Sequence, residues 1–510
     1  AIAVNGSIPG PLLRLREGTT VRLNVHNQLE EDTSIHWHGL LVPFQLDGVP
    51  GVSFPGVKPG ETFTAEFPVR QSGTYWWHSH SGLQEQAGHY GPIVVDPAGP
   101  DPVQADREYI VVLSEFSETD PNVLYDKLKK SADYFNYEQP TWTDDYPLSG
   151  AQRRNWARMR MSPVDILDIT GSTFTYLING HGPADNLEFN FQPGERVRLR
   201  FINSGAATYF NIRIPGLPMT VVQADGQNVE PVEVDEFQIG IAETYDVIVT
   251  PGNDAAYTMV AESMDRSGMG VATLASAPGA RAAIPPLLTM ADMGMGGMAG
   301  MAGMGGGSES MPGNSSGQGA ARPGMRDTSR LPADVEVGPG LAMVSANPVD
   351  RTGDPGVGLS DVPHRTLNYR KLRALTPNAD RRIPSRRMEL HLTSNMERYM
   401  WSFDGKKFSA VSDDPIRFAY NERVRVKLIN DTMMTHPIHL HGHFFELVNG
   451  APADRQPLKH TVNVQPGGSV EFDLTADEPG DWAFHCHILY HLVAGMFQIV
   501  TVANPAGDEA

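Results

Sequence analysis

Three segments of the chain repeat one pattern, and this repeat restricts the fold more than any other feature of the sequence. Residues 4–27, 178–203 and 403–430 each have an Asn-Gly or Asp-Gly pair near their start and end in a stretch that alternates apolar and polar residues. Such alternation is typical of a strand with one buried face. Short strands separated by Pro/Gly turns, in three copies, predict an all-β chain of three Greek-key β-sandwich domains.

The repeat divides the chain into three domains and a connector. The predicted domains span residues 1–100, 101–277 and 386–510, and the second contains a partly helical insertion at about 117–165. The connector, 278–385, has a methionine-rich part, in which 294–307 contain only Gly, Met and Ala, followed by a basic part. The methionine-rich linker cannot form a packed core, so we expect it to be disordered. The basic part is expected to be a solvated connector.

Composition excludes several classes of protein. The formal net charge of −20 argues against nucleic-acid binding. A single cysteine excludes an internal disulfide. No apolar run of about 18 residues is present, so we expect no transmembrane segment. The chain opens at Ala1 in strand-like sequence, and no signal peptide is visible.

Histidines cluster in pairs separated by one residue. Random placement of the chain's 17 histidines gives fewer than about one such pair, whereas the sequence has five. Two imidazoles at this spacing on a strand point to the same face and can share a metal or bind adjacent metals. A core or surface histidine explains one pair equally well, but four clusters in the first and third repeats, at 36–38, 78–80, 436–441 and 485–491, indicate metal centres. The matching region of the second repeat, 209–213, has no histidine, so the second domain is predicted to be a spacer.

The only cysteine lies between two histidines, in His485-Cys486-His487, and His491 and Met496 follow. Thiolate, imidazole and a weak axial thioether are the ligands of blue-copper electron-transfer sites. Neighbouring side chains on a strand point to opposite faces, so the thiolate and the two flanking imidazoles are expected to reach different metals. One short covalent path would then join these metals, which predicts an oxidase rather than a one-copper carrier.

The four histidine clusters together resemble the four copper signatures of multicopper oxidases. The resemblance extends over all three domains apart from the connector and the insertion, and the methionine-rich linker and the first domain look most like the copper-resistance protein A branch. It implies three cupredoxin-like domains and four copper ions: one type 1, one type 2 and two type 3.

The resemblance also assigns ligands by position. Type 1 copper would be held by His436, Cys486, His491 and axial Met496, and type 2 copper by His36 and His439. The type 3 pair would be held by His38, His78, His80, His441, His485 and His487. The remaining histidines, His26, His89, His181, His364, His391, His443 and His460, are expected to be structural or exposed.

The resemblance implies that dioxygen is reduced to water, and this reaction needs acidic residues that supply protons. Asp47 matches an acidic position near the trinuclear site of the family, and a proton-relay role and a plain Asp-Gly turn both remain open. Many bacterial relatives have Glu directly after the second type 1 histidine, whereas this chain has Leu492. Glu85, which follows His80 closely in sequence, is a candidate for the other half of the proton path.

The resemblance implies a catalytic role for Cys486, which passes electrons through its neighbouring imidazoles, and dioxygen as the acceptor. The reductant is expected to be Cu(I) or a small phenol. Thioethers select Cu(I), so Met293, Met295, Met298, Met301 and Met304 are candidates for Cu(I) capture, although these methionines also fit a low-complexity linker. A copper-sequestering protein without turnover is the alternative from another class. The family implies a periplasmic location.

Overall fold

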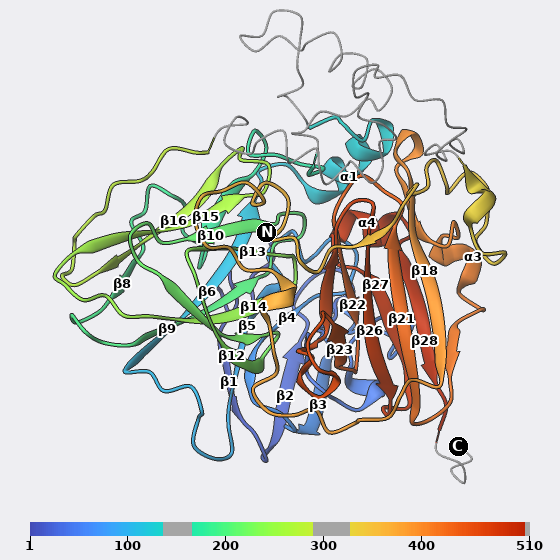
Figure 1. The fold of residues 1–510 in the computed structure, drawn as a ribbon, viewed down its shortest axis with the longest axis horizontal. Helices are drawn as coiled ribbons and strands as arrows, with labels where there is room; N and C mark the ends of the chain where they lie inside the picture. Colours follow the sequence, from blue (N-terminus) through green and yellow to red (C-terminus); the bar gives the residue numbers. More distant parts are fainter. Residues whose placement is uncertain (136–165, 289–326, 505–510) are drawn as a thin grey trace, which may run out of the picture.

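The computed structural model describes residues 1–135, 166–288 and 327–504. Strands dominate, and they form six sheets (Figure 1). Two sheets belong to each third of the chain, which agrees with the predicted all-β organisation. Among the described residues, no helix has the length and apolar character needed to cross a membrane.

The first third contains a three-stranded sheet, β1-β5-β4, and a two-stranded sheet, β2-β3. Ile93, Tyr75 and Trp77 are among the buried side chains that fill the core between them. The element bounds are β1 (Leu13–Arg16), β2 (Thr20–His26), η1 (Phe44–Leu46), β3 (Thr62–Pro68), β4 (Gly73–His78) and β5 (Tyr90–Asp96).

The second third has a six-stranded sheet, β12-β11-β14-β9-β6-β7, and a five-stranded sheet, β13-β10-β15-β16-β8. The bounds are β6 (Arg107–Phe116), α1 (Pro121–Lys130), β7 (Thr175–Ile178), β8 (Glu188–Asn190), β9 (Val197–Asn203), β10 (Phe210–Arg213), β11 (Met219–Ala224), β12 (Gln227–Val234), β13 (Glu236–Ile239), β14 (Thr244–Val249), β15 (Ala256–Ser263) and β16 (Met269–Ala275). Helix α1 lies within the range predicted for the insertion, and residues 136–165 of that range lie outside the described part of the chain.

The last third pairs a seven-stranded sheet, β19-β18-β21-β26-β23-β24 with β17 beside β26, with a five-stranded sheet, β20-β28-β27-β22-β25. The bounds of its strands are β17 (Val349–Asp350), β18 (Arg386–Asn395), β19 (Met400–Phe403), β20 (Ile416–Phe418), β21 (Glu422–Asn430), β22 (His436–Leu440), β23 (Phe445–Val448), β24 (Leu458–Lys459), β25 (Thr461–Val464), β26 (Gly468–Ala476), β27 (Gly480–Cys486) and β28 (Phe497–Val502). The helices are η3 (Thr328–Arg330), η4 (Tyr369–Lys371), η5 (Met396–Arg398), α3 (Phe408–Val411), η6 (Ala453–Arg455) and α4 (Leu489–Ala494).

The sequence repeat corresponds to a structural repeat. The turn residues Asn5, Asn179 and Asp404 have positive φ angles of 49°, 50° and 52°, and each precedes a glycine that also has a positive φ. Two successive residues in this conformation form the tight turn that suits a hairpin, which explains the Asn-Gly and Asp-Gly pairs.

In each copy an asparagine with the same role stands at the end of one strand or directly after it: after β2, and at the ends of β9 and β21. The side-chain amides of Asn27, Asn203 and Asn430 donate to the carbonyl oxygens of Glu31, Thr208 and Met434, at 2.8, 2.9 and 2.7 Å. Each amide also donates to a second carbonyl from a distant part of its own domain. The loop after each strand is therefore closed in the same way in all three copies, including the two that lead to histidine clusters.

The first third contacts both of the others. Strand β4 touches β9 and β14 of the second third, and η1 touches β27 of the last. Figure 1 shows the first third (blue) against the strands of the last third (orange to red). The first and last thirds of the chain are therefore neighbours in the fold.

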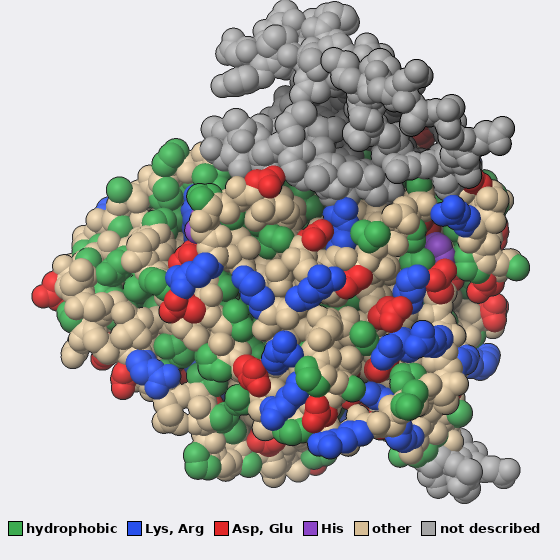
Figure 2. Space-filling view, viewed as in Figure 1, with side chains coloured by type: hydrophobic (Ala, Val, Ile, Leu, Met, Phe, Trp, Pro, Cys, Tyr) green, Lys and Arg blue, Asp and Glu red, His purple; other side chains and the backbone are tan. Residues whose placement is uncertain are grey.

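The described part of the connector, 327–385, lies along the second and last thirds. Ala374 forms a bridge with Val229, and Thr366 forms one with Glu236. Most arginines of the basic part of the connector, and Arg386 at the start of the last domain, are exposed, and most have acidic partners. The pairs are Arg365 with Glu233 and Asp235, Arg370 with Asp350, Arg381 with Asp454, Arg382 with Asp380 and Arg386 with Glu422. Figure 2 shows cationic and anionic side chains interspersed on the visible face. The expected disorder of the methionine-rich linker concerns 289–326, which fall outside the described ranges.

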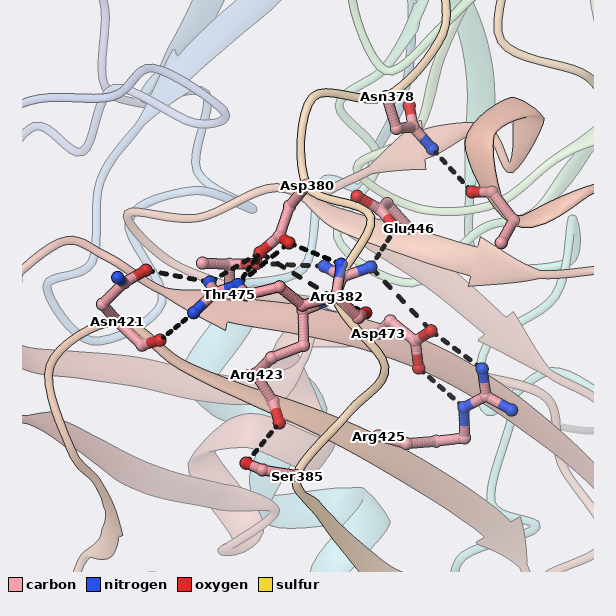
Figure 3. Close-up of polar contacts among 11 residues, drawn as sticks. Asn378, Asp380, Arg382, Ser385, Asn421, Arg423, Arg425, Glu446, Asp473 and Thr475 are labelled. Atoms are coloured by element: carbon pink, nitrogen blue, oxygen red, sulfur yellow. Dashed lines mark hydrogen bonds and ion pairs between the residues drawn. The ribbon is translucent and has the colours of Figure 1, made fainter.

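One cation of the last third is buried among acids. Arg423 of β21 contacts Glu446 of β23 and Asp473 of β26, and its side chain is 5 % exposed (Figure 3). Asp473 is shared with Arg425 at 2.6 and 2.8 Å. The cluster joins three neighbouring strands of the seven-stranded sheet, whereas β22 and β27, which lead into the clusters at 436–441 and 485–491, belong to the five-stranded sheet.

We expect Arg423→Met to lower the thermal unfolding temperature clearly. Removing one partner of a buried ion pair leaves an uncompensated charge and costs about 3–5 kcal/mol. Calorimetry would measure the change, with Arg365→Met as the exposed control, for which little change is expected because solvent screens its ion pairs. Equal, small effects of both substitutions would contradict this account of the last domain.

Candidate metal centre

Strand pairing brings the histidine clusters of the last third together. In the register of β22 with β27, His439 lies opposite His485 and Ile438 lies opposite Cys486. In the first third, His36 pairs with His78 of β4 through two backbone hydrogen bonds of 2.8 and 3.1 Å. Each His-x-His stretch begins on a strand or bridge residue, and its two imidazoles lie close together, with ring centroids 4.8–5.6 Å apart.

The first and last thirds of the chain meet at these imidazoles. The rings of His36 and His441 stack with centroids 3.8 Å apart, as do those of His38 and His439. The Nε2 atoms of His78 and His487 are 3.3 Å apart. The structure therefore brings 36–38 and 78–80 together with 439–441 and 485–487. We name this group the eight-histidine cluster; its members are His36, His38, His78, His80, His439, His441, His485 and His487.

A second group lies on the other side of β27. The Sγ atom of Cys486 is 3.5 Å from Nδ1 of His436 and 3.8 Å from Nδ1 of His491. Met496 is buried, and its backbone accepts a hydrogen bond from the Cys486 amide at 3.1 Å. We name these four residues the cysteine site. Cys486 thus faces away from its two histidine neighbours, as predicted from strand geometry.

The chemistry of both groups fits a soft cation. Among the described residues, the buried ring atoms His36 Nε2, His80 Nε2 and His439 Nε2 have no hydrogen-bond partner. In three other places, ring nitrogens face one another at 3.0–3.3 Å. A cation accepted by these nitrogens would satisfy lone pairs that otherwise are costly to bury. Imidazole and thiolate are the donors that suit copper.

Burial shifts the pKa values of most of these donors. It keeps the imidazoles neutral and therefore able to bind a metal, and it makes the thiolate unfavourable unless a metal is bound. It lowers the pKa of His38, His80 and His439 well below the ordinary value, so the rings are neutral and offer a lone pair. The pKa of Cys486 is raised by burial, so the thiolate needs a bound cation beside it.

The opposite ring nitrogens of the eight-histidine cluster are held by the surrounding chain. His36 Nδ1 donates to the Asp47 carbonyl at 2.7 Å, and His441 Nδ1 donates to Asp47 Oδ2 at 2.8 Å. Glu85 Oε2 lies 2.7 Å from His78 Nδ1. Such partners fix the tautomer and the direction of each ring and leave Nε2 for a metal. Both acids singled out in the sequence therefore contact the cluster, and Leu492 instead packs in an apolar group with Val49 and Phe497.

Sequence reasoning missed the residues that surround the cysteine site. Asp168 accepts hydrogen bonds from His491 Nε2 and from the Tyr399 hydroxyl, both at 2.8 Å. The Trp401 ring stacks on His491 with centroids 3.6 Å apart. Asp168 follows the insertion of the second domain and has no motif that could have identified it.

The histidines expected to lie outside the copper sites differ in environment. His26 and His181 are exposed, whereas His391 is buried between Asp431 and Glu389. Two of them contact the eight-histidine cluster. His443 Nδ1 donates to the His441 carbonyl at 3.1 Å, and the His460 ring lies 4.8 Å from that of His38 and 5.3 Å from that of His439. The sequence context of His460 did not suggest this contact.

The buried imidazoles predict a pH dependence of the metal-free protein. An unfolded histidine titrates near pH 6.5, whereas burial lowers the pKa of His485 to about 4. Between these values the unfolded chain binds more protons, so stability falls as the pH drops from about 6.5 to 4. Calorimetry of the metal-free protein across this range would measure it.

Two substitutions make this test specific. His485→Gln should weaken the pH dependence, whereas His181→Gln, at an exposed histidine, should leave it unchanged. An unfolding temperature that stays constant between pH 6.5 and 4 would contradict the neutral state of the cluster.

Comparison with known proteins agrees with this geometry. Three family models, each described as multicopper oxidase, match residues 1–99, 107–279 and 381–506. Copper resistance protein A of Escherichia coli is 47% identical over 98% of this chain and 89% of its own length. Multicopper oxidase MmcO of Mycobacterium tuberculosis is 31% identical over 97% of this chain and 82% of its own length. Among solved structures, the laccase of Botrytis aclada aligns with a TM-score of 0.67 at 20% identity, covering 98% of this chain and 83% of that one. The chain belongs to the multicopper oxidase family of copper-dependent oxidoreductases that use oxygen.

Proposed function

We propose that this protein couples the one-electron oxidation of Cu(I) to the four-electron reduction of dioxygen to water, and that it acts in copper tolerance in the periplasm. One observation carries the proposal: Cys486 belongs to one ligand group, while its direct neighbours His485 and His487 belong to the other. The relatives named copper resistance protein A support the role in copper tolerance.

Four copper ions fit the two groups. We assign type 1 copper to His436, Cys486, His491 and Met496, type 2 copper to His36 and His439, and the type 3 pair to the other six members of the eight-histidine cluster. His80, His441 and His485 have ring nitrogens within 4.8 Å of one another, which supports one type 3 set. His38 and His78, with His487 facing His78, make the other. When bound, the copper ions supply one-electron redox chemistry and the site of oxygen reduction.

The chain itself links the two ligand groups covalently and excludes water from them. Only the backbone of adjacent residues separates the Cys486 side chain from the imidazoles of His485 and His487, so the link between the two groups is covalent. All three side chains are buried, with exposures of 0–2 %. Burial excludes water from both groups and preserves their geometry without reorganisation.

We further propose that Asp47 and Glu85 serve proton delivery. Asp47 is 1 % exposed and contacts two imidazoles of different predicted copper types, His36 and His441. Glu85 is 3 % exposed and contacts His78. Each carboxylate reaches the cluster from outside, on the nitrogen opposite to the metal side. A proton held by either carboxylate is separated from the proposed reaction site by a single imidazole ring.

The reductant is the open part of the proposal. Thioether sulfur selects Cu(I), and Met293, Met295, Met298, Met301 and Met304 would collect it for type 1 copper. Small phenols are the second candidate, supported by the fold shared with laccases. A copper-sequestering role without turnover remains the alternative outside the oxidases.

We expect the copper-loaded protein to consume oxygen with Cu(I) as the only reductant, in a ratio of one oxygen to four Cu(I). An oxygen electrode with a Cu(I) chelate as donor measures this. Cys486→Ser should abolish both the consumption and the intense visible absorption of the thiolate site. Copper binding without any oxygen uptake would instead favour sequestration.

A variant lacking residues 290–311 distinguishes the two reductants within the same assay. Cu(I) oxidation should fall more than phenol oxidation if the methionines collect Cu(I). Equal loss of both activities, or none, would count against this recruitment.

For Asp47, we expect Asp47→Asn to slow oxygen consumption by about 10²-fold, the lower range for a lost general acid. The visible absorption of type 1 copper and the copper content should persist, because the amide can still accept the hydrogen bond from His441. Unchanged turnover would leave Asp47 with the structural role of its Asp-Gly turn.

A further inference from the structure

A buried lysine joins the second and third domains beside the eight-histidine cluster. Lys459 Nζ lies 3.0 Å from Asp225 Oδ2 and 2.9 Å from Glu243 Oε1, and the three side chains are 0–1 % exposed. Lys459 ends β24 of the last domain, whereas both acids come from the second domain. A buried charge of this kind persists only when it is paired and hydrogen-bonded.

Asp225 also holds the backbone that follows the lysine. Its Oδ2 atom accepts hydrogen bonds from the amides of His460 and Thr461, both at 3.2 Å. Its Oδ1 atom accepts from the Thr244 amide within its own domain, also at 3.2 Å. A single carboxylate thus holds two amides at the entry into β25 and is itself fixed by a third amide of the second domain.

The turn that carries Asp225 is itself fixed against the first domain. Asp225 and Gly226 have φ angles of 47° and 73°. A Cβ atom on Gly226 would lie 2.3 Å from the ring of Tyr75, so glycine permits a close approach of the two domains. Gln227 adds a hydrogen bond to the Tyr75 hydroxyl at 3.0 Å.

The fixed backbone in turn orients a ligand. The His460 carbonyl accepts from Nδ1 of His439 at 2.7 Å. The Thr461 hydroxyl lies 3.2 Å from the same nitrogen and 3.4 Å from Nε2 of His38. The residues held by Asp225 are therefore the ones that set the ring direction of His439 and touch His38.

We propose that Asp225 is a positioning residue for the type 2 copper ligand His439. It acts through the amides of residues 460 and 461, with Lys459 as the ion-pair anchor. The second domain, predicted to be a spacer, then has a part in building the cluster formed by the first and third domains. This inference rests on the copper assignment proposed above.

The charge balance makes Asp225→Asn an informative substitution. Glu243 keeps its other partners, the hydroxyl of Tyr369 at 2.7 Å and the amide of Gly240 at 2.8 Å. Lys459 therefore retains one carboxylate, and the variant is expected to fold. What it loses is the negative charge and one of the two accepting oxygens: an amide whose oxygen faces residues 460 and 461 turns its NH2 group toward the Thr244 amide, which then has no acceptor and pushes the turn out of place.

We expect Asp225→Asn to weaken type 2 copper binding by about 10- to 100-fold, the range for altered outer partners of metal ligands. The electron paramagnetic resonance signal of type 2 copper should shift or diminish, while the type 1 visible absorption is unchanged. Equilibrium dialysis against a copper chelator measures the affinity, independently of oxidase activity. Asp225→Glu, which keeps the charge and displaces the carboxylate, is the second variant and should act in the same direction.

Arg423→Met is the matched control, since it disturbs a buried ion cluster of the last domain, the domain of Lys459 and His439, that touches no cluster histidine (Figure 3). It should lower the unfolding temperature and leave the type 2 signal unchanged. A folded Asp225 variant with wild-type type 2 copper, or one that loses type 1 and type 2 copper equally, would overturn the proposal. Absence of a type 2 signal from the loaded wild-type protein would instead refute the copper assignment.

Discussion

The fold depends on a single arrangement in which neutral imidazoles from the two ends of the chain face one another in a buried interface. Burying several ring nitrogens without partners is unfavourable, and the sandwich domains provide little reason by themselves to place them there. The arrangement becomes favourable when cations accept the lone pairs. The interface between the first and last domains is thus an interface of ligands as much as one of apolar packing, with Asp47 of the first domain reaching His441 of the last.

Strand geometry explains how two ligand groups remain separate and yet adjacent. The pleat of β27 sends Cys486 to one side and His485 to the other, and His487 follows directly after the strand. No additional loop is needed to divide the two groups. The two groups have different surroundings. Asp168 and the Trp401 ring contact His491 of the cysteine site. Backbone carbonyls and the carboxylates of Asp47 and Glu85 contact the eight-histidine cluster.

The sequence was sufficient for the features that local chemistry encodes. Alternation predicted strands, the shared Asn-Gly and Asp-Gly pairs marked the repeat, and histidine spacing identified the clusters. It was insufficient where a partner is distant in sequence. Asp168 lies 323 residues from His491, and Asp225 lies 235 residues from His460. Neither has a neighbouring pattern that distinguishes it from an ordinary acidic residue, because its role arises only from the packing of one domain on another. His460 shows the same limit, since its ring reaches the cluster only after β24 and β25 are placed.

The asparagine at the end of each repeated strand has a consequence for how such a chain can diversify. Its NH2 group donates to main-chain oxygens and its side-chain oxygen accepts from the main-chain amide two residues further on, so it closes the following loop whatever side chains that loop carries. Copies of an ancestral unit could therefore exchange ordinary residues for metal-binding ones, or the reverse, without losing their shape. The second copy, with Tyr209 and Phe210 in place of histidines, kept the scaffold while taking up a different task. In a chain with three copies of such a unit, the loop sequence of each copy can change independently of the other two.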